Sequence, residues 1–224
     1  MIVTDGQRLL ERLRERFAAE GLFVVLPVEV EELREVVPLA RGAVLVGDGG
    51  GTFFSRFLAA GAGEEGDPLD SYTRRVVRRV VEDVLGGTEL AIFHPFAGEK
   101  VHLPFQRLGM VAGLPAPGPL GVQVHPRFGP WWAYRALVAL AVPVESEGPM
   151  AESCRDCGGP CVNDCREHAT AGGRWVAGSL RGEIVCSDAC GARSRCPVGR
   201  DAHYSPEQIA FHARARRALA ARRA

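Results

Sequence analysis

The sequence lacks the features that mark several large classes of protein. No stretch reaches the roughly 18 consecutive apolar residues of a membrane-spanning helix. Residues 1–16 carry charges in an amphipathic pattern, where a secretory signal would have an apolar core. The formal net charge is zero and 46% of the residues are hydrophobic. We therefore expect neither a disordered chain nor a strongly basic protein that binds polyanions. We therefore expect a globular, cytoplasmic protein with no membrane partner.

Cysteine is absent from the first 153 residues, and all seven cysteines follow within a short segment. In a reduced cytoplasm such a cluster is typical of metal or iron–sulfur binding rather than of disulfides. Three interpretations stay open for these thiols: a [4Fe-4S] cluster, a structural zinc site, or inert or disulfide-linked cysteines. The sequence alone does not choose the ligands among Cys154, Cys157, Cys161, Cys165, Cys186, Cys190 and Cys196.

The cysteine distribution divides the chain into a main domain at 1–150, a cysteine-rich segment at 151–200 and a C-terminal helix at 201–224. In the main domain, apolar periodicity and capping residues predict helices, and short β-branched runs predict strands. The predicted helices and strands alternate irregularly along the chain, which favours an α+β fold with a mixed sheet flanked by helices. Helices are predicted at 5–21, 67–85 and 103–112, and a further helix is predicted directly after the glycine-rich turn 47–52. Strands are predicted at 22–28, 43–46, 89–94, 120–124 and 131–144. The last of these runs is also long enough to be a helix.

The most distinctive stretch of the main domain is residues 121–135, GVQVHPRFGPWWAYR. It resembles the MMACHC (CblC) family of cobalamin-processing proteins, in which a strand ends in the same His-Pro-Arg-Phe-Gly run. Shorter matches follow the family's order at 67–70, 94–95, 111–113 and 204–208. The resemblance implies a flavin-reductase or nitroreductase-like α+β fold and base-off cobalamin binding. It also implies removal of the upper ligand, cyanide by reduction or an alkyl group by transfer to glutathione.

The same resemblance implies a cobalamin site, and it makes Arg127 a catalytic candidate. The Arg127 guanidinium fork suits a carboxylate of glutathione or an amide of the corrin, whereas the structural alternative is a surface pair with a carboxylate. His94 and His125 are expected to shape the pocket by hydrogen bonding, because these families bind the corrinoid without a histidine ligand. The cofactor-binding candidates are His94, Gly113, His125, Arg127, Phe128, Gly129, Trp131 and Trp132.

The cysteine-rich segment is similar to the ferredoxin-like domain of the epoxyqueuosine reductases, which also bind base-off cobalamin. Cys154-x2-Cys157-x3-Cys161-x3-Cys165 departs from the C-x2-C-x2-C-x3-C-P ferredoxin run by one residue and by the missing proline. Seven thiols cannot complete two four-cysteine clusters, so a second cluster would need a further ligand such as His168 or His203. This resemblance leaves a tRNA-modifying reductase and a non-catalytic corrinoid carrier as alternatives, and tRNA as a further partner.

Overall fold

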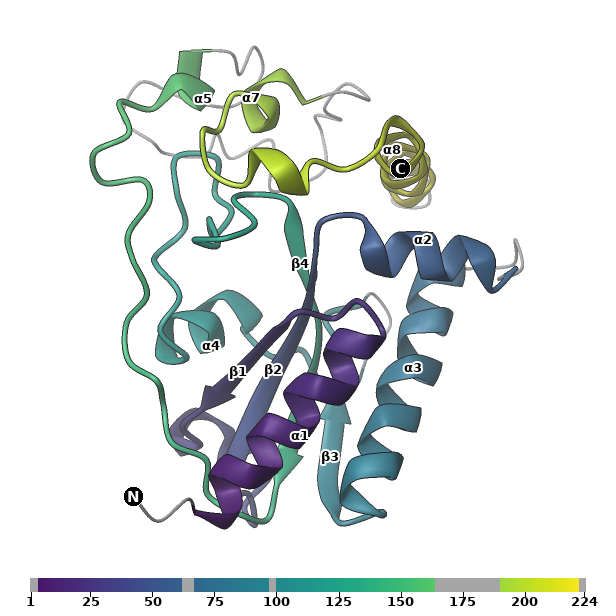
Figure 1. Cartoon of the computed structure of the whole chain (residues 1–224), viewed down its shortest axis with the longest axis vertical. Coiled ribbons are helices and arrows are strands. Elements are labelled where there is room, and N and C mark those ends of the chain that lie inside the picture. The colour runs from purple at the N-terminus through teal and green to yellow at the C-terminus, as the bar shows by residue number, and fades with distance from the viewer. Residues whose placement is uncertain (1–3, 62–66, 97–99, 164–189, 222–224) are drawn as a thin grey trace. The chain divides into compact units, whose positions relative to one another are not determined.

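The computed structural model describes residues 4–61, 67–96, 100–163 and 190–221, which belong to two units (Figure 1). The first unit comprises Met1–Leu114 and Trp132–Pro149. The second comprises Pro115–Trp131 and Met150–Ala224. The segment Pro115–Trp131 falls within the predicted main domain 1–150, whereas its contacts group it with the cysteine-rich segment.

The first unit is built on a four-stranded sheet with the order β1-β2-β4-β3. Every pairing in this sheet is antiparallel, so the fold is α+β as expected, but the expected mixed sheet is wrong. All residues of β1 and β2 are buried. Pro27 lies in an edge strand, where the missing N–H of proline removes no central ladder bond. The strands are β1 Val24–Val28, β2 Gly42–Gly49, β3 Glu89–Phe93 and β4 Trp132–Leu140.

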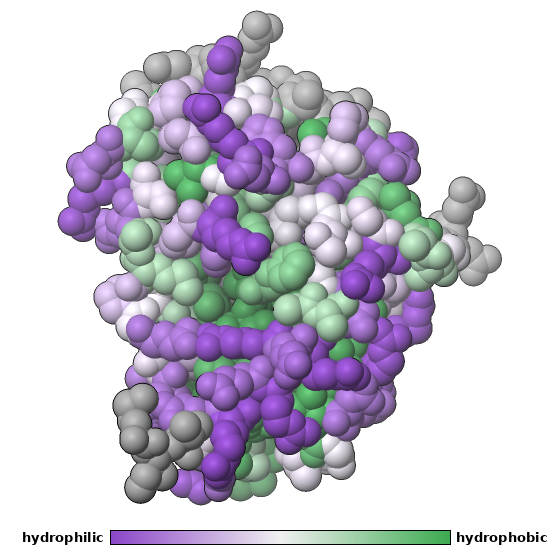
Figure 2. All heavy atoms as spheres, viewed as in Figure 1, coloured by the Kyte–Doolittle hydropathy of each residue, from purple (hydrophilic) through white to green (hydrophobic). Residues whose placement is uncertain are grey.

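Two long helices, α1 (Asp5–Ala19) and α3 (Pro68–Leu85), lie side by side on one face of the sheet (Figure 1). A capping box begins α1: the Gln7 N–H donates to Thr4 Oγ1, and the Thr4 N–H donates to Gln7 Oε1. The valines of α3 are buried as predicted, and the outward face of the two helices is hydrophilic (Figure 2). Shorter helices of this unit are η1 Glu31–Leu33, α2 Thr52–Ala59 and α4 Phe105–Val111.

The strand predicted at 120–124 is wrong, because these residues form a turn. The prolines that precede this segment and its Gly121 disfavour a ladder, and its backbone groups bond within the loop. The Gly118 N–H donates to the Val122 carbonyl at 2.9 Å, and the Gly121 N–H donates to the Gly118 carbonyl at 2.8 Å. The run 131–144, by contrast, contains the strand β4, Trp132–Leu140, and no helix.

The second unit contains short helices and one long C-terminal helix. Ser205 caps α8, since its Oγ accepts from the Gln208 N–H at 3.1 Å, as the sequence predicts. The expected ferredoxin-like arrangement falls largely on 164–189, outside the described residues. No helix in the described ranges is long and apolar enough to cross a membrane. The helices are α5 Pro160–Asn163, α7 Gly191–Ser194, η2 Arg200–Ala202 and α8 Pro206–Ala221.

Candidate functional site

A buried ion pair joins the two central strands of the first unit. Asp48 lies near the end of β2 and is fully buried, while the Arg135 side chain on β4 is 7% exposed. The guanidinium binds the carboxylate bidentately, with Nε–Oδ1 at 3.0 Å and Nη2–Oδ2 at 3.1 Å. A β-bulge between Val46 and Gly47 immediately precedes this contact. The pair fixes the strand that leads into the glycine-rich turn.

His94 is held beside this ion pair by the backbone of β4. Its Nδ1 lies 2.8 Å from the Arg135 carbonyl oxygen. Because a carbonyl only accepts, Nδ1 carries the proton in this contact. The ring stacks on Phe96 with centroids 5.0 Å apart, and the Arg74 guanidinium covers the Phe96 ring. The arrangement fixes the orientation of a buried imidazole at the end of β3.

Two other predicted residues of the first unit have clear packing roles. Trp132 is buried at the start of β4, and its ring packs edge-on against Tyr134 at 4.6 Å. Burial raises the pKa of Tyr134 above its usual value. Gly113 has φ of +94°, and a Cβ there would lie 2.2 Å from the Gly148 carbonyl oxygen. Only glycine fits this turn.

The predicted residues of the second unit form one tight loop. His125 and Gly129 exchange backbone hydrogen bonds of 2.9 and 2.8 Å, which close the five-residue turn between them. Gly129 has φ of +58°, and a Cβ there would lie 2.0 Å from the Val198 carbonyl oxygen. The loop is therefore shaped by its own hydrogen bonds and by close packing against Val198 and Gly199.

The His125 imidazole stabilises this loop from inside. Its Nδ1 accepts from the N–H groups of Arg127 at 3.1 Å and Phe128 at 3.4 Å. Burial, with a smaller effect of the Arg127 charge, lowers the pKa of His125 to about 4. The imidazole is therefore neutral at physiological pH, and its Nδ1 acts as an acceptor.

Arg127 stands exposed on the loop, with its guanidinium 4.9 Å from the centre of the buried Phe128 ring. A guanidinium over an aromatic ring makes a cation–π contact, and its planar fork is the side-chain group that best matches a carboxylate. The backbone N–H of Arg127 is fixed by His125. The loop thus presents a cation from an ordered backbone, which is the geometry expected of an anchor for a carboxylate.

Trp131 is buried beneath the guanidinium of Arg193, a residue that was not among the predicted site residues. Arg193 lies 4.5 Å from the Trp131 ring centre and 4.7 Å from that of Tyr204, at distances typical of cation–π contacts. Its Nε and Nη2 both donate to the Pro130 carbonyl, the Nε at 2.9 Å. The His203 ring also packs against the Trp131 ring, with the two ring centroids 4.3 Å apart. Arg193 therefore fixes the end of the loop.

Buried polar atoms without hydrogen-bond partners occur in this same unit. The Trp131 indole N–H is one of them, and both amide atoms of the fully buried Gln208 are others. Leaving such groups unpaired costs about 1–3 kcal/mol each. Gln208 belongs to the 204–208 motif, so the sequence pointed to this segment without giving the residue a role. Donors and acceptors of this kind would be satisfied by an amide-bearing ligand.

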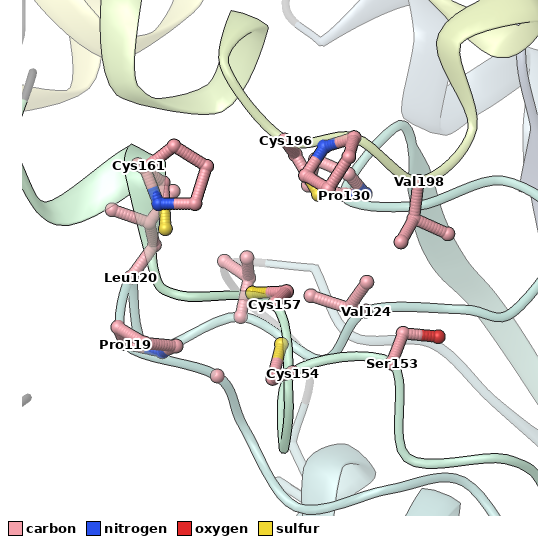
Figure 3. A pocket seen from close by; sticks show the side chains of 14 residues that line it. Pro119, Leu120, Val124, Pro130, Ser153, Cys154, Cys157, Cys161, Cys196 and Val198 are labelled. Carbon is pink, nitrogen blue, oxygen red and sulfur yellow. The ribbon is translucent and has the colours of Figure 1, made fainter.

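Four cysteines line one pocket of the second unit (Figure 3). Cys154, Cys157 and Cys161 come from the first cysteine run, and Cys196 comes from the second. Figure 3 shows the sulfur atoms of the first three directed into the same space. The other lining residues are almost all apolar: Gly118, Pro119, Leu120, Val122, Val124, Pro130, Ser153, Pro160, Pro197 and Val198.

Burial in this pocket raises the pKa of three of its thiols. Burial, with smaller effects of the neighbouring cysteines, raises the pKa of Cys154 to about 11. Burial likewise raises the pKa of Cys161 and of Cys196. The five described cysteines form no disulfide. Within the described ranges, no group of three or more His, Cys, Asp or Glu side chains is arranged to hold a metal ion.

Cys190 is oriented differently from the pocket cysteines. Its side chain caps α7, because Sγ accepts from the Arg193 N–H at 3.4 Å, and it is not among the pocket's lining residues. Cys165 and Cys186 lie outside the described residues, as does His168. The structure therefore brings four of the seven predicted metal ligands together and sets Cys190 apart.

Sequence reasoning missed Arg193, Gly118 and the Asp48–Arg135 pair. An acidic residue two positions after the apolar run 43–46 was a signal for Asp48. Nothing local marks Arg193, because its partners Pro130 and Trp131 lie about sixty residues away in the chain. A Cβ at Gly118 would lie 2.9 Å from Cys154 Sγ, a close approach that also joins two distant segments.

Comparison with known proteins gives one informative similarity. Neither a protein-family profile nor a curated protein sequence matches the chain. Among solved structures, the chain resembles a C. elegans B12-trafficking protein, CblC, described as a human MMACHC homologue. The TM-score is 0.61 at 15% identity, over 92% of this chain and 91% of the other. The similarity shows that the two proteins share a fold.

Proposed function

We propose that this protein binds cobalamin in the base-off form and removes its upper axial ligand reductively. The observation that carries the proposal is the run 121–135, which resembles the cobalamin-processing family, on a chain whose fold matches a B12-trafficking protein over 92% of its length. Base-off binding separates the lower nucleotide from cobalt, which makes the metal easier to reduce.

The candidate residues are of the chemical types that a corrinoid site needs. A corrin is a broad, mainly apolar disc with amide groups around its rim, so its site needs aromatic walls and a few polar partners. The unpaired indole N–H of Trp131 and the unpaired amide of Gln208 offer the donors and acceptor that peripheral amides would satisfy. His94 and His125 each commit Nδ1 to the backbone, in keeping with shaping roles.

Two reactions would follow from such binding. In decyanation, one electron reduces cobalt(III) to cobalt(II), and cyanide leaves with the bonding pair. In dealkylation, a thiolate such as that of glutathione attacks the alkyl carbon; an S–C bond forms, and the Co–C pair remains on cobalt as cobalt(I). We assign to Arg127 the binding of the thiol's carboxylate, because its guanidinium is exposed on an ordered loop.

We further propose that the cysteine-rich segment carries electrons to the corrinoid through an iron–sulfur centre. A bound [4Fe-4S] cluster would supply one electron at a time. The chemistry of the donors fits this group, since four thiols line one apolar pocket. Zinc is the alternative occupant, and it would make the segment structural rather than redox-active.

Titration of hydroxocobalamin and cob(II)alamin with the protein tests the proposal. The corrin absorption bands should shift to those of the base-off form, and addition of reductant or glutathione should then release the upper ligand. Base-off binding without any ligand release would identify a corrinoid carrier instead. Absence of a spectral shift at saturating protein would contradict the proposal altogether.

A tRNA-binding assay distinguishes the proposed function from its alternative, an epoxyqueuosine-reductase-like enzyme. The arginine-rich C-terminal residues 214–223 are the feature that suggests it, and basic helices bind nucleic acid through phosphate contacts. Saturable, salt-dependent tRNA binding together with cobalamin binding would favour this alternative.

A further inference from the structure

The end of the 125–131 loop depends on a side chain that is distant in sequence. Pro130 has no backbone N–H, so its carbonyl is its only main-chain hydrogen-bonding group. That carbonyl accepts from Nε of Arg193 at 2.9 Å and also from Nη2 of Arg193. A carbonyl oxygen has two lone pairs, so one edge of a guanidinium can occupy both. The loop is therefore held at Pro130 by a residue 63 positions away.

The same guanidinium also packs on two buried aromatic rings. It lies 4.5 Å from the centre of the Trp131 ring and 4.7 Å from the centre of the Tyr204 ring. Trp131 is 2% exposed and Tyr204 is 6% exposed, and cation–π contacts of this kind are stronger when they are withdrawn from water. The Nε and Nη2 edge and the ring contacts of Arg193 are thus all used to order the loop.

Arg193 extends from a turn whose backbone is itself ordered. Its N–H donates to Cys190 Sγ at 3.4 Å, and its carbonyl accepts from the Cys196 N–H at 3.3 Å. Ala192, directly before it, is 1% exposed. The guanidinium therefore reaches Pro130 from a fixed point of the second unit.

A second contact from the same part of the chain supports the loop just before Pro130. A Cβ at Gly199 would lie 2.2 Å from the carbonyl carbon of Phe128, and a Cβ at Gly129 would lie 2.0 Å from the Val198 carbonyl oxygen. Residues 193–199 therefore contact residues 128–131 both by a side chain and by backbone packing. Arg127 stands directly before this supported stretch.

We propose that Arg193 is a positioning residue for Arg127. By binding the Pro130 carbonyl, Arg193 fixes the conformation in which the loop presents the Arg127 guanidinium to the carboxylate of a thiol co-substrate. The inference rests on the proposed function, which assigns that carboxylate to Arg127. Arg193 itself does not contact the co-substrate. Its loss should spread the Arg127 guanidinium over several positions, so that co-substrate binding weakens while the chemical step is little changed.

The first measurement needs no ligand and reports on the loop alone. The His125 imidazole has a pKa of about 4, chiefly because it is buried, and its Nδ1 accepts from the Arg127 N–H. In Arg193→Gln, a histidine titration followed by NMR should show this pKa rising towards 6.5 as the ring becomes hydrated. An unchanged His125 pKa would overturn the proposal.

Three controls separate an effect on the loop from an effect on the whole fold. The His94 signal of the first unit should stay at its native position in Arg193→Gln. Arg200→Gln removes an exposed cation of the second unit and should leave the His125 pKa at about 4. Arg193→Lys keeps the charge but loses the planar fork, so it should raise the His125 pKa by a smaller amount. Loss of the native His94 signal in both Arg193 variants would show a role in global stability and overturn the proposal.

The second measurement is a double-mutant cycle on glutathione-dependent dealkylation. Arg193→Gln should raise the KM for glutathione about tenfold and change kcat by less than about threefold, as expected for the loss of a binding interaction. The variant with both Arg127→Ala and Arg193→Gln should have the KM of Arg127→Ala alone, because no guanidinium is left to position. Additive effects would show that Arg193 does not act through Arg127, and would overturn the proposal.

The two measurements also separate this inference from the proposed function. Absence of thiol-dependent turnover in the unmodified protein would contradict the proposed function. The His125 titration would then still decide whether Arg193 orders the loop, because it requires neither cobalamin nor thiol.

Discussion

At the scale of single residues, Arg127 separates an active processing enzyme from a passive carrier. This residue is exposed, and its guanidinium lies over the Phe128 ring. The backbone of the loop is fixed by His125 and Gly129, whatever side chain stands at 127. A substitution at Arg127 should therefore change what the loop binds more than how the loop folds.

Arg127→Ala should weaken binding of an anionic thiol co-substrate about tenfold to a hundredfold, because it removes a charge-assisted contact of about 1.5–3 kcal/mol. Cobalamin affinity and the thermal midpoint should change little. The measurement is glutathione-dependent dealkylation at varied thiol concentration, alongside a cobalamin titration.

Arg127→Lys and Lys100→Ala are the controls for this experiment. The lysine variant keeps the charge but loses the planar fork, so partial recovery would indicate a bidentate contact. Lys100 is an exposed cation outside the 121–135 motif. If Arg127→Ala left both binding and turnover unchanged, the assignment of Arg127 would be wrong.

At the scale of elements, the Asp48–Arg135 pair joins β2 to β4 in the middle of the sheet. Both partners are withdrawn from water, so removal of one leaves the other as an uncompensated buried charge. The strands around them are entirely buried or nearly so. We expect this contact to matter far more for stability than the exposed ion pairs between helices.

Asp48→Ala should lower the free energy of unfolding by about 3–5 kcal/mol. Urea denaturation followed by circular dichroism measures the change. Asp83→Ala is the matched control, because Asp83 pairs with Arg16 at 2.5 Å with both side chains about half exposed. That variant should lose no more than about 1 kcal/mol. Equal losses in the two variants would contradict the role assigned to burial.

At the scale of the whole molecule, the segment Pro115–Trp131 depends on residues that follow Pro149. Gly129 packs on Val198, and the Pro130 carbonyl binds Arg193. Trp131 loses its cation–π partner if the chain ends before Arg193. The candidate residues of this loop therefore need the cysteine-rich unit for their conformation.

A fragment of residues 1–149 should retain the antiparallel sheet but lose the structure of 115–131. Limited proteolysis should cut the fragment within this segment at a protease concentration that leaves the same segment intact in the full chain. Mass spectrometry locates the cut. Equal protection of 115–131 in the fragment and the full chain would show that the loop folds without the second unit.

The sequence by itself determined the elements that local patterns specify. Helical periodicity with Thr4 and Ser205 as caps predicted α1 and α8, and the β-branched runs predicted β1, β2 and β3. Helix and strand signals of this kind depend on neighbouring residues, so they can be read without the fold. The same patterns failed at 120–124, where the backbone bonds within a loop, whereas the strand predicted at 131–144 contains β4.

Only the tertiary structure decided which distant residues meet. The sheet order, the buried Asp48–Arg135 pair and the Arg193 clamp join segments that lie tens of residues apart. The pocket likewise brings Cys196 together with Cys154, Cys157 and Cys161, a grouping that the sequence did not choose. A local pattern specifies the conformation of one turn or element. Long-range packing decides which distant segments come into contact, and that packing depends on all contacts of the folded chain together.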